Sequence, residues 1–445
     1  MSTSTFSRLR SRMRRHVVAA WEHEGFKKYF ANTGWLFAAR MISYAVSFFT
    51  IAVVARYLGP ENYGKLSYAQ SFISLFSIFA SLGIDNILYR DLIAHPEKEE
   101  ELLGTAIVSR LLFGCLTIAV AVVASLCLDS DKVLTAMIAI ISFTFIFQPF
   151  TSFNTYLNAK IASKYYAFIS IFDSFFMAGL KLVFVYLGFG ILYFASLLLL
   201  EAILFAGYYL VVYVVRFKGS LARLRFSART CMTLFKDSWP LLLASVSSYF
   251  YGRIDQVMIQ YFMDSASVGF YDAAMRLTEV WIFFPSLIIS SIFPAVANAY
   301  RTDLTQYYQR FKVLSLLTLA SMLCIVVPVF LLAPLIVHFV FGSAFAPTAG
   351  ILRIYVWSGI GITFIALVQS YLVIENRGKQ FFLITFAGAL ANIALNLFLI
   401  PHYGMDGAAI ATLLSYGLMV IAFCAFRENR AGLLQFAHKK VRNAS

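Results

Sequence analysis

The sequence predicts an all-α polytopic membrane protein that crosses the bilayer about twelve times. The chain of 445 residues is 60% hydrophobic and only 13% charged, whereas soluble domains are about 45–50% apolar and about 25% charged. Apolar runs of about 20 residues, enough to cross a hydrocarbon core, recur along the whole chain. Because these runs are longer than barrel strands and do not alternate with polar residues, we expect helices.

The predicted helices follow one another with short connections. They lie at 33–55, 66–89, 104–128, 133–158, 165–188, 190–215, 237–262, 272–298, 313–336, 347–374, 380–400 and 405–426.

Basic residues predict the orientation of these helices. Of the 36 Lys and Arg, 27 lie in the two termini and in the loops after even-numbered helices, and three lie in the loops on the other side. Cytoplasmic loops carry the excess of Lys and Arg, so we expect both termini in the cytoplasm. The net charge of +14 is therefore mainly a topology signal, with membrane lipids and not nucleic acid as the expected partner of the Arg-rich start.

The segment GPENYGK (59–65) nearly spells a phosphate-binding loop. Leu66 stands where that loop needs Ser or Thr, and the segment lies between two membrane helices on the non-cytoplasmic side. We therefore expect a turn, in which Gly59 caps a helix, Pro60 prevents its continuation and Gly64 opens the return. We therefore do not expect transport driven by ATP hydrolysis in this chain.

The chain shows a repeat with an offset of about 204 residues. Trp35 pairs with Trp239, and Gly64 pairs with Gly269 after a gap of one residue. Two copies of six helices enter from the same side, so the repeat is parallel, and substrate is expected between the halves. The predicted division is a basic cytoplasmic segment, a six-helix bundle, a basic linker, a second six-helix bundle and a cytoplasmic tail, at 1–32, 33–215, 216–236, 237–426 and 427–445.

Several stretches, in order and at regular spacing, resemble a known family. They are NTGWLF, AVVARYLGPENYGKLSYAQSF, LGIDNILYRDL, LLGTAIVSRLL and YGRIDQVMIQYFM. The chain is similar to the Wzx-type lipid-linked oligosaccharide flippases of the multidrug/oligosaccharidyl-lipid/polysaccharide exporter superfamily. The resemblance implies two bundles around a V-shaped central cavity that opens alternately to each side. It also implies a bacterial inner-membrane location, an undecaprenyl-diphosphate-linked oligosaccharide as substrate, and work beside glycosyltransferases, a polymerase and a ligase.

Charged residues inside the predicted helices are the candidate functional residues, because an ionisable group in the bilayer needs a cavity or a partner. Arginine binds phosphate oxygens with two parallel hydrogen bonds, which suits a diphosphate headgroup. The predicted cavity residues are Arg40, Lys181, Arg253, Arg276, Tyr249 and Tyr251, the tyrosines stacking on sugar rings. Asp255 and Glu279 are candidates for coupling to H⁺ or Na⁺, with a neighbouring Arg shared between carboxylate and substrate phosphate.

The spacing of these residues predicts their faces. Arg276 and Glu279 are three apart and are expected to form a local pair. Arg253 and Asp255 are two apart and point to different faces. An equally open reading makes the acidic and basic residues a structural network of ion pairs.

Two other functions compete with the flippase. An exporter of drugs would favour an acidic cavity, and a flippase for the lipid-linked peptidoglycan precursor would carry two extra helices. A membrane glycosyltransferase, polymerase or ligase needs large outer loops, which this chain lacks. We expect no cofactor, since no nucleotide motif is present, and no metal site, since the six His and five Cys form none of the usual ligand spacings.

Overall fold

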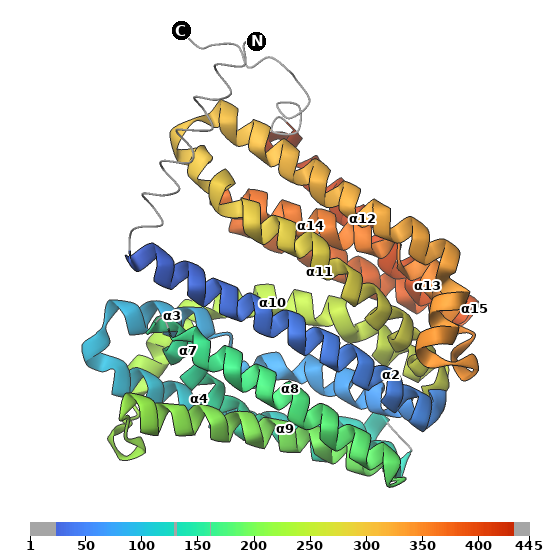
Figure 1. The fold of residues 1–445 in the computed structure, drawn as a ribbon, viewed down its shortest axis with the longest axis horizontal. Helices are drawn as coiled ribbons and strands as arrows, with labels where there is room; N and C mark the ends of the chain where they lie inside the picture. Colours follow the sequence, from blue (N-terminus) through green and yellow to red (C-terminus); the bar gives the residue numbers. More distant parts are fainter. Residues whose placement is uncertain (1–23, 129–130, 161, 431–445) are drawn as a thin grey trace.

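The computed structural model describes residues 24–128, 131–160 and 162–430, and these residues form helices and short connections without a strand (Figure 1). Nine helical segments there are long and apolar enough to span a membrane. Two of these segments are each two helices joined at a sharp bend, and α10 (Ala228–Phe262) is a further long helix. The twelve predicted passes and the all-α membrane class are confirmed.

The N-terminal half runs from α2 to α9. Its helices are α2 (Glu24–Ser81), α3 (Asp85–Ala94), α4 (Glu99–Leu128), α5 (Lys132–Ser142), α6 (Thr144–Phe147), α7 (Ser152–Ala159), α8 (Ser163–Tyr186) and α9 (Ile191–Val211). One π-helical turn, Val212–Arg216, extends α9. Most of the predicted N-terminal segment (1–32) lies outside the described residues.

The C-terminal half runs from α10 to α15. Its helices are α10, α11 (Ser265–Thr302), α12 (Leu304–Phe341), α13 (Thr348–Tyr355), α14 (Ser358–Ile374) and α15 (Gly378–Ala425). The side chain of Ser227 caps α10 by accepting a hydrogen bond from the Thr230 backbone. Residues 228–236 of the predicted linker (216–236) are therefore helical. Residues 431–445 of the predicted tail lie outside the described part of the chain.

The bend in α2 corrects the prediction for GPENYGK. Only Gly59 is non-helical there, at φ 70° and ψ 170°, and Pro60 begins the next helix, where its missing N–H costs nothing. Gly64 therefore lies inside a helix and not in a turn. The Arg56 guanidinium, just before this bend, donates to the carbonyls of Phe339 and Val340 at the end of α12. A cation is favourable at this position because unpaired carbonyls gather at a helix C-terminus.

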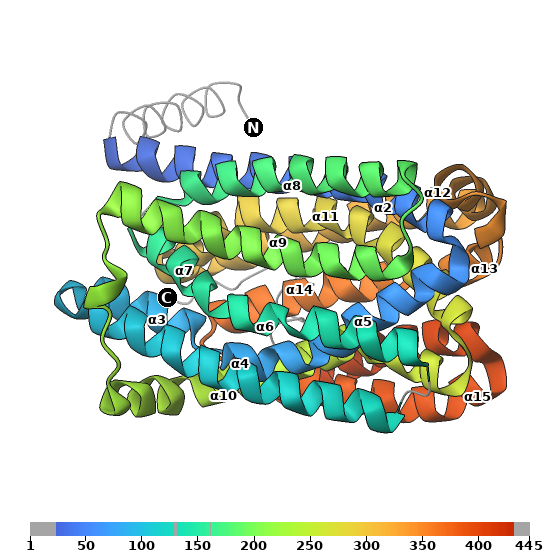
Figure 2. The same ribbon diagram turned by 90° about the horizontal axis from the view of Figure 1, so that it is seen from below.

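In Figure 1, α2 and α11 meet at one end and diverge toward the other. The start of α10 remains packed against α3 and α4 of the N-terminal half, in the lower left of Figure 2. We call the two ends the closed end, which contains Gly59 and Gly404, and the basic end, which contains α3 and the linker 217–227. One buried apolar cluster joins both halves and includes Tyr63, Val268 and Phe345. A second cluster belongs almost wholly to the N-terminal half, and a third belongs to the C-terminal half alone. Shared core on one side only is the packing expected of a V-shaped molecule.

A crossing of α2 and α11 brings the halves into backbone contact at the closed end. A Cβ atom on Gly64 would lie 1.6 Å from the carbonyl oxygen of Ser265, and one on Gly269 would lie 2.2 Å from that of Pro60. The two glycines that the repeat pairs thus face each other across the halves. Glycine is required here because any side chain would force the backbones apart.

Replacing Gly64 with Ala is expected to destabilise this conformation by about 1–3 kcal/mol, the usual cost of overpacking. Gly179→Ala is the matched control, because its Cβ has nothing within 4 Å and an exposed helical Ala is favourable by roughly 0.5–1 kcal/mol. Thermal unfolding of the purified protein measures both. Equal melting temperatures for the two variants would contradict the close crossing.

Candidate functional site

The closed end contains a buried carboxylate that both halves share. Asp272 on α11 has an exposed fraction of 0%. The Tyr63 hydroxyl donates to its Oδ2 at 2.5 Å, and the Ser67 hydroxyl donates to the same oxygen at 3.0 Å. The Gln256 amide of α10 donates to Oδ1 at 2.7 Å. Three hydrogen bonds from two other membrane passes therefore hold one side chain of α11.

Two arginines balance the charge of Asp272. Arg276, one turn later on α11, places Nε 2.7 Å from Oδ2, and Arg253 of α10 lies 3.9 Å from Oδ1. Arg276 also donates to Gln70 of α2 at 3.3 Å. A carboxylate taken out of water is tolerated only with such compensation, so the Asp272 cluster is an electrostatic connection between the halves.

Arg253 and Glu279 lie at the open edge of this cluster. Their side chains are 3.9 Å apart, with exposed fractions of 30% and 50%. Arg276, three residues before Glu279, forms its close ion pair with Asp272 instead. The Arg253 guanidinium is therefore only weakly paired and partly exposed.

Asp255 occupies a separate polar site within the C-terminal half. Its exposed fraction is 5%, and the hydroxyls of Tyr271 and Thr412 donate to Oδ2, each at 2.6 Å. The Asn396 amide donates to Oδ1 at 2.6 Å. The expectation of an Arg shared between this carboxylate and substrate phosphate is wrong for Asp255, since no ion pair with it is found in the described part of the chain. Arg253 points to the other face of α10, as the spacing predicts.

The site around Asp255 has uncompensated polarity. Asn392 bonds to Asn396, yet one atom of each amide, Nδ2 of Asn392 and Oδ1 of Asn396, lacks a partner among the described residues. Neutral donors reduce the cost of burying the carboxylate but do not neutralise it. The described residues contain no group of three or more His, Cys, Asp or Glu that would hold a metal ion.

Arg40 and Lys181 lie in the N-terminal half, apart from Arg253. The Lys181 ammonium is 3.9 Å from Glu201 of α9, so its partner comes from the neighbouring helix. Arg40 is exposed, one turn before Ser43, which accepts a hydrogen bond from Ser174 of α8 at 2.7 Å. Both cations therefore lie along the α2, α8 and α9 side of the molecule.

The two predicted cavity tyrosines, Tyr249 and Tyr251, both lie on α10. The side chain of Tyr249 lies outside the part of the chain whose side chains are described. Tyr251 makes its contacts inside the C-terminal half: its hydroxyl donates to the Thr412 carbonyl at 3.3 Å, and its ring packs edge to face against Tyr416 at 4.8 Å. In this conformation Tyr251 supports the Asp255 region and contacts none of the candidate cations.

A protein-family model matches more than half of this chain. The family model described as "Polysaccharide biosynthesis protein" matches residues 29–300. The chain belongs to this polysaccharide biosynthesis family. The matched range covers the N-terminal half, α10 and nearly all of α11, and so includes the Asp272 cluster and both crossing glycines.

Two curated relatives come from Haloferax volcanii. The probable low-salt glycan biosynthesis flippase Agl15 is 29% identical over 199 residues, which is 44% of this chain and 42% of the relative. The probable flippase AglR is 28% identical over 175 residues, 38% of this chain and 36% of the relative. The aligned part spans less than half the length of either relative.

Solved structures share the fold of this family member. The lipid II flippase MurJ in an inward closed conformation superposes with a TM-score of 0.73 at 16% identity, covering 91% of this chain and 93% of that one. An inward-facing multidrug resistance MATE family transporter of the MOP superfamily gives 0.69 at 14% identity, covering 90% and 96%. The resemblance seen in the sequence is confirmed.

Sequence reasoning missed Asp272. It was the first residue of a predicted helix (272–298), where a carboxylate normally faces water, whereas α11 begins seven residues earlier. Two signals point to it: the four-residue spacing to Arg276, and the polar positions 63, 67, 70 and 71, which follow a helical period on α2.

Replacing Asp272 with Asn is expected to destabilise the protein by about 3–5 kcal/mol, because two arginines lose their buried counter-charge. Asp303→Asn is the control: Asp303 caps α12 by accepting from the backbones of Thr305 and Gln306, and Asn caps a helix equally well. Thermal unfolding of both variants in detergent tests this. An Asp272→Asn protein as stable as the control would show that the cluster does not hold the halves together.

Proposed function

We propose that this protein is a flippase for a lipid-linked oligosaccharide. It takes an undecaprenyl-diphosphate-linked repeat unit from the cytoplasmic leaflet of the bacterial inner membrane and presents it in the outer leaflet. Membership of the polysaccharide biosynthesis family and the flippase names of two relatives support this function. The protein is a transporter and not an enzyme, acting between the glycosyltransferases and the polymerase or ligase of surface polysaccharide synthesis.

The observation that carries the proposal is the position of Arg253. It lies where the two halves meet, its guanidinium is partly exposed, and its acidic neighbours are both 3.9 Å away. A diphosphate offers several oxygens to a guanidinium at hydrogen-bonding distance, which is a stronger interaction than either existing contact. Arg276, Arg40 and Lys181 supply further positive charge for the headgroup and its sugar.

The arrangement of the halves supports alternating access. The basic end carries the Lys- and Arg-rich linker, so the positive-inside rule puts the open side of the V in the cytoplasm. This conformation then receives substrate from inside, while the Asp272 cluster and the glycine crossing close the outer side. Diphosphate bound to Arg253 competes with Asp272 for the guanidinium, which weakens the outer closure once substrate has arrived.

We propose Asp255 as the coupling site for H⁺ or Na⁺. Its carboxylate is buried among hydroxyl and amide groups of α10, α11 and α15, so a bound cation would neutralise it and draw these helices together. Glu279 is half exposed and paired with Arg253, which suits substrate binding better than ion coupling. The cation therefore acts in the C-terminal half without occupying the substrate site.

Arg253→Gln is expected to slow flipping by roughly tenfold to a hundredfold, the value of a lost charge-assisted hydrogen bond. The assay uses proteoliposomes that contain a fluorescent undecaprenyl-diphosphate oligosaccharide and follows how fast its headgroup becomes accessible from the opposite side. Arg301→Gln, an exposed charge at the end of α11, is the control.

Two results would contradict the flippase proposal. If the wild-type protein does not accelerate flipping under any ion gradient, the function is wrong, and cationic drugs are the next ligands to test. If Arg253→Gln flips as fast as Arg301→Gln, the protein is a flippase but its headgroup site lies elsewhere.

Asp255→Asn is expected to abolish the dependence of flipping on an H⁺ or Na⁺ gradient, because the neutral amide no longer requires a cation. The rate without a gradient should change much less. Comparing imposed pH and Na⁺ gradients in the same proteoliposomes identifies the ion. Loss of gradient dependence in Glu279→Gln, with Asp255→Asn unaffected, would move the coupling site to Glu279.

A further inference from the structure

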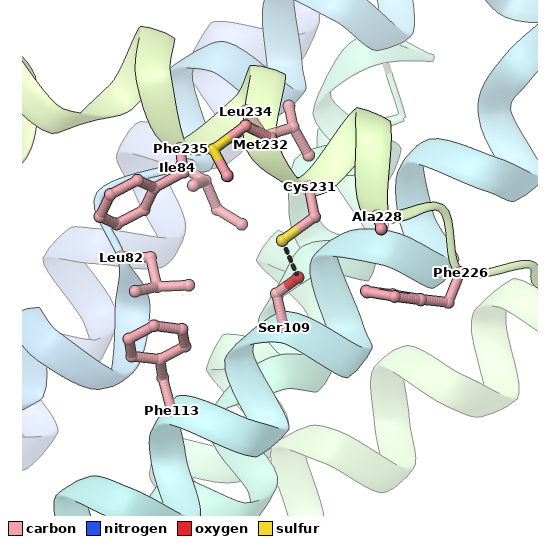
Figure 3. Close-up of a pocket in the computed structure, with 10 residues that line it drawn as sticks. All are labelled: Leu82, Ile84, Ser109, Phe113, Phe226, Ala228, Cys231, Met232, Leu234 and Phe235. Atoms are coloured by element: carbon pink, nitrogen blue, oxygen red, sulfur yellow. Dashed lines mark hydrogen bonds between the residues drawn. The ribbon is translucent and has the colours of Figure 1, made fainter.

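A separate apolar pocket lies at the basic end, where the two halves touch. It has a volume of about 260 Å³, and its lining includes Leu82, Phe113, Phe226, Met232 and Phe235. Figure 3 shows these side chains surrounding an open space between the start of α10, the linker, the end of α2 and α4. The lining is almost entirely hydrocarbon, so the pocket suits an apolar chain.

The pocket offers no hydrogen-bonding group to a polar ligand. Ser109 and Cys231 also line it, but their side chains bond to each other at 3.2 Å (Figure 3). The nearby Thr230 hydroxyl donates to Glu101. Water or a sugar would therefore gain little by entering, whereas an acyl chain would bury apolar surface against the lining side chains.

Positive charge flanks this apolar pocket. Arg225 precedes the lining residue Phe226, Arg229 follows Ala228, and Lys236 follows Phe235; all three basic residues are exposed. The structure gives none of them an acidic partner within the described residues. The one acidic residue next to Lys236, Asp237, is already bound to Arg90 at 2.7 Å.

We propose that this pocket binds an anionic phospholipid. One acyl chain enters the pocket, and the phosphate lies among Arg225, Arg229 and Lys236 at the membrane surface. Basic pockets between membrane helices are typical sites for anionic headgroups. The lipid contacts α4 of one half and α10 of the other, so it stabilises the arrangement in which the halves meet along this side.

The site is distinct from the proposed substrate site. Cys231 and Arg253 are both on α10, and a helical rise of 1.5 Å per residue separates them by roughly 33 Å. The proposal depends only on the membrane location of the protein and not on its flippase activity. If the lipid site is disproved, the flippase proposal is unaffected, and the reverse also holds.

The test is native mass spectrometry of the full-length protein in detergent, titrated with phosphatidylglycerol and with phosphatidylethanolamine of the same acyl chains. The wild type is expected to prefer phosphatidylglycerol. Arg225→Gln with Arg229→Gln should weaken that binding by roughly thirtyfold, from about 1 kcal/mol per basic residue. The control is Arg301→Gln with Lys312→Gln, which removes two exposed charges elsewhere and should leave binding unchanged.

A second variant tests the pocket itself. Cys231→Phe fills it and should remove the preference even though every basic residue remains; a melting curve shows whether this variant is folded. Three results would overturn the proposal: no preference for the anionic lipid in the wild type, equal binding by the two charge variants, or displacement of phosphatidylglycerol by undecaprenyl phosphate at lower concentration. The last result would assign the pocket to the isoprenoid chain.

Discussion

The buried charge of Asp272 constrains the whole molecule. A carboxylate with no exposed surface must collect its partners from wherever the fold supplies them, and here they come from α2, α10 and α11. The halves can share these partners only if their backbones approach closely. The glycine crossing permits that approach, and the single shared apolar core forms around it. Toward the basic end α2 and α11 diverge, and the described polar links between the halves are the exposed Arg90–Asp237 pair and hydrogen bonds between α4 and α10.

The sequence predicted the membrane passes well and their connections poorly. Hydropathy reports that a run of residues is long enough to cross the bilayer, which is why twelve passes emerged. It does not report how many residues the chain needs to reverse direction. At Gly59 one residue suffices, so Gly64 belongs to a helix, and Arg56 bonds to the end of α12. Both facts depend on the packing of segments far apart in the sequence.

The spacing of residues along one helix correctly predicted which face each side chain occupies, but not its partners on other helices. Two residues of separation placed Arg253 and Asp255 on different faces, as observed. The partners of Asp255 could not be foreseen, since Asn396 and Thr412 lie more than a hundred positions away and are ordinary polar residues in apolar helices. Glu201, the partner of Lys181, lies on the neighbouring helix α9, which local spacing along α8 does not show either. A candidate charge is visible in one sequence, but the groups that decide its role are brought together only by the fold.

The brevity of the connections at the closed end determines how that end can open. Gly59 and Gly404 each join two helices, and only Met263 and Asp264 separate α10 from α11. Connections this short cannot extend, so the two helices of each hairpin must move together as one rigid unit. The closed end can then open only if neighbouring hairpins separate from each other along the α2 and α11 surfaces. The motion is a rigid-body separation and not the opening of a loop.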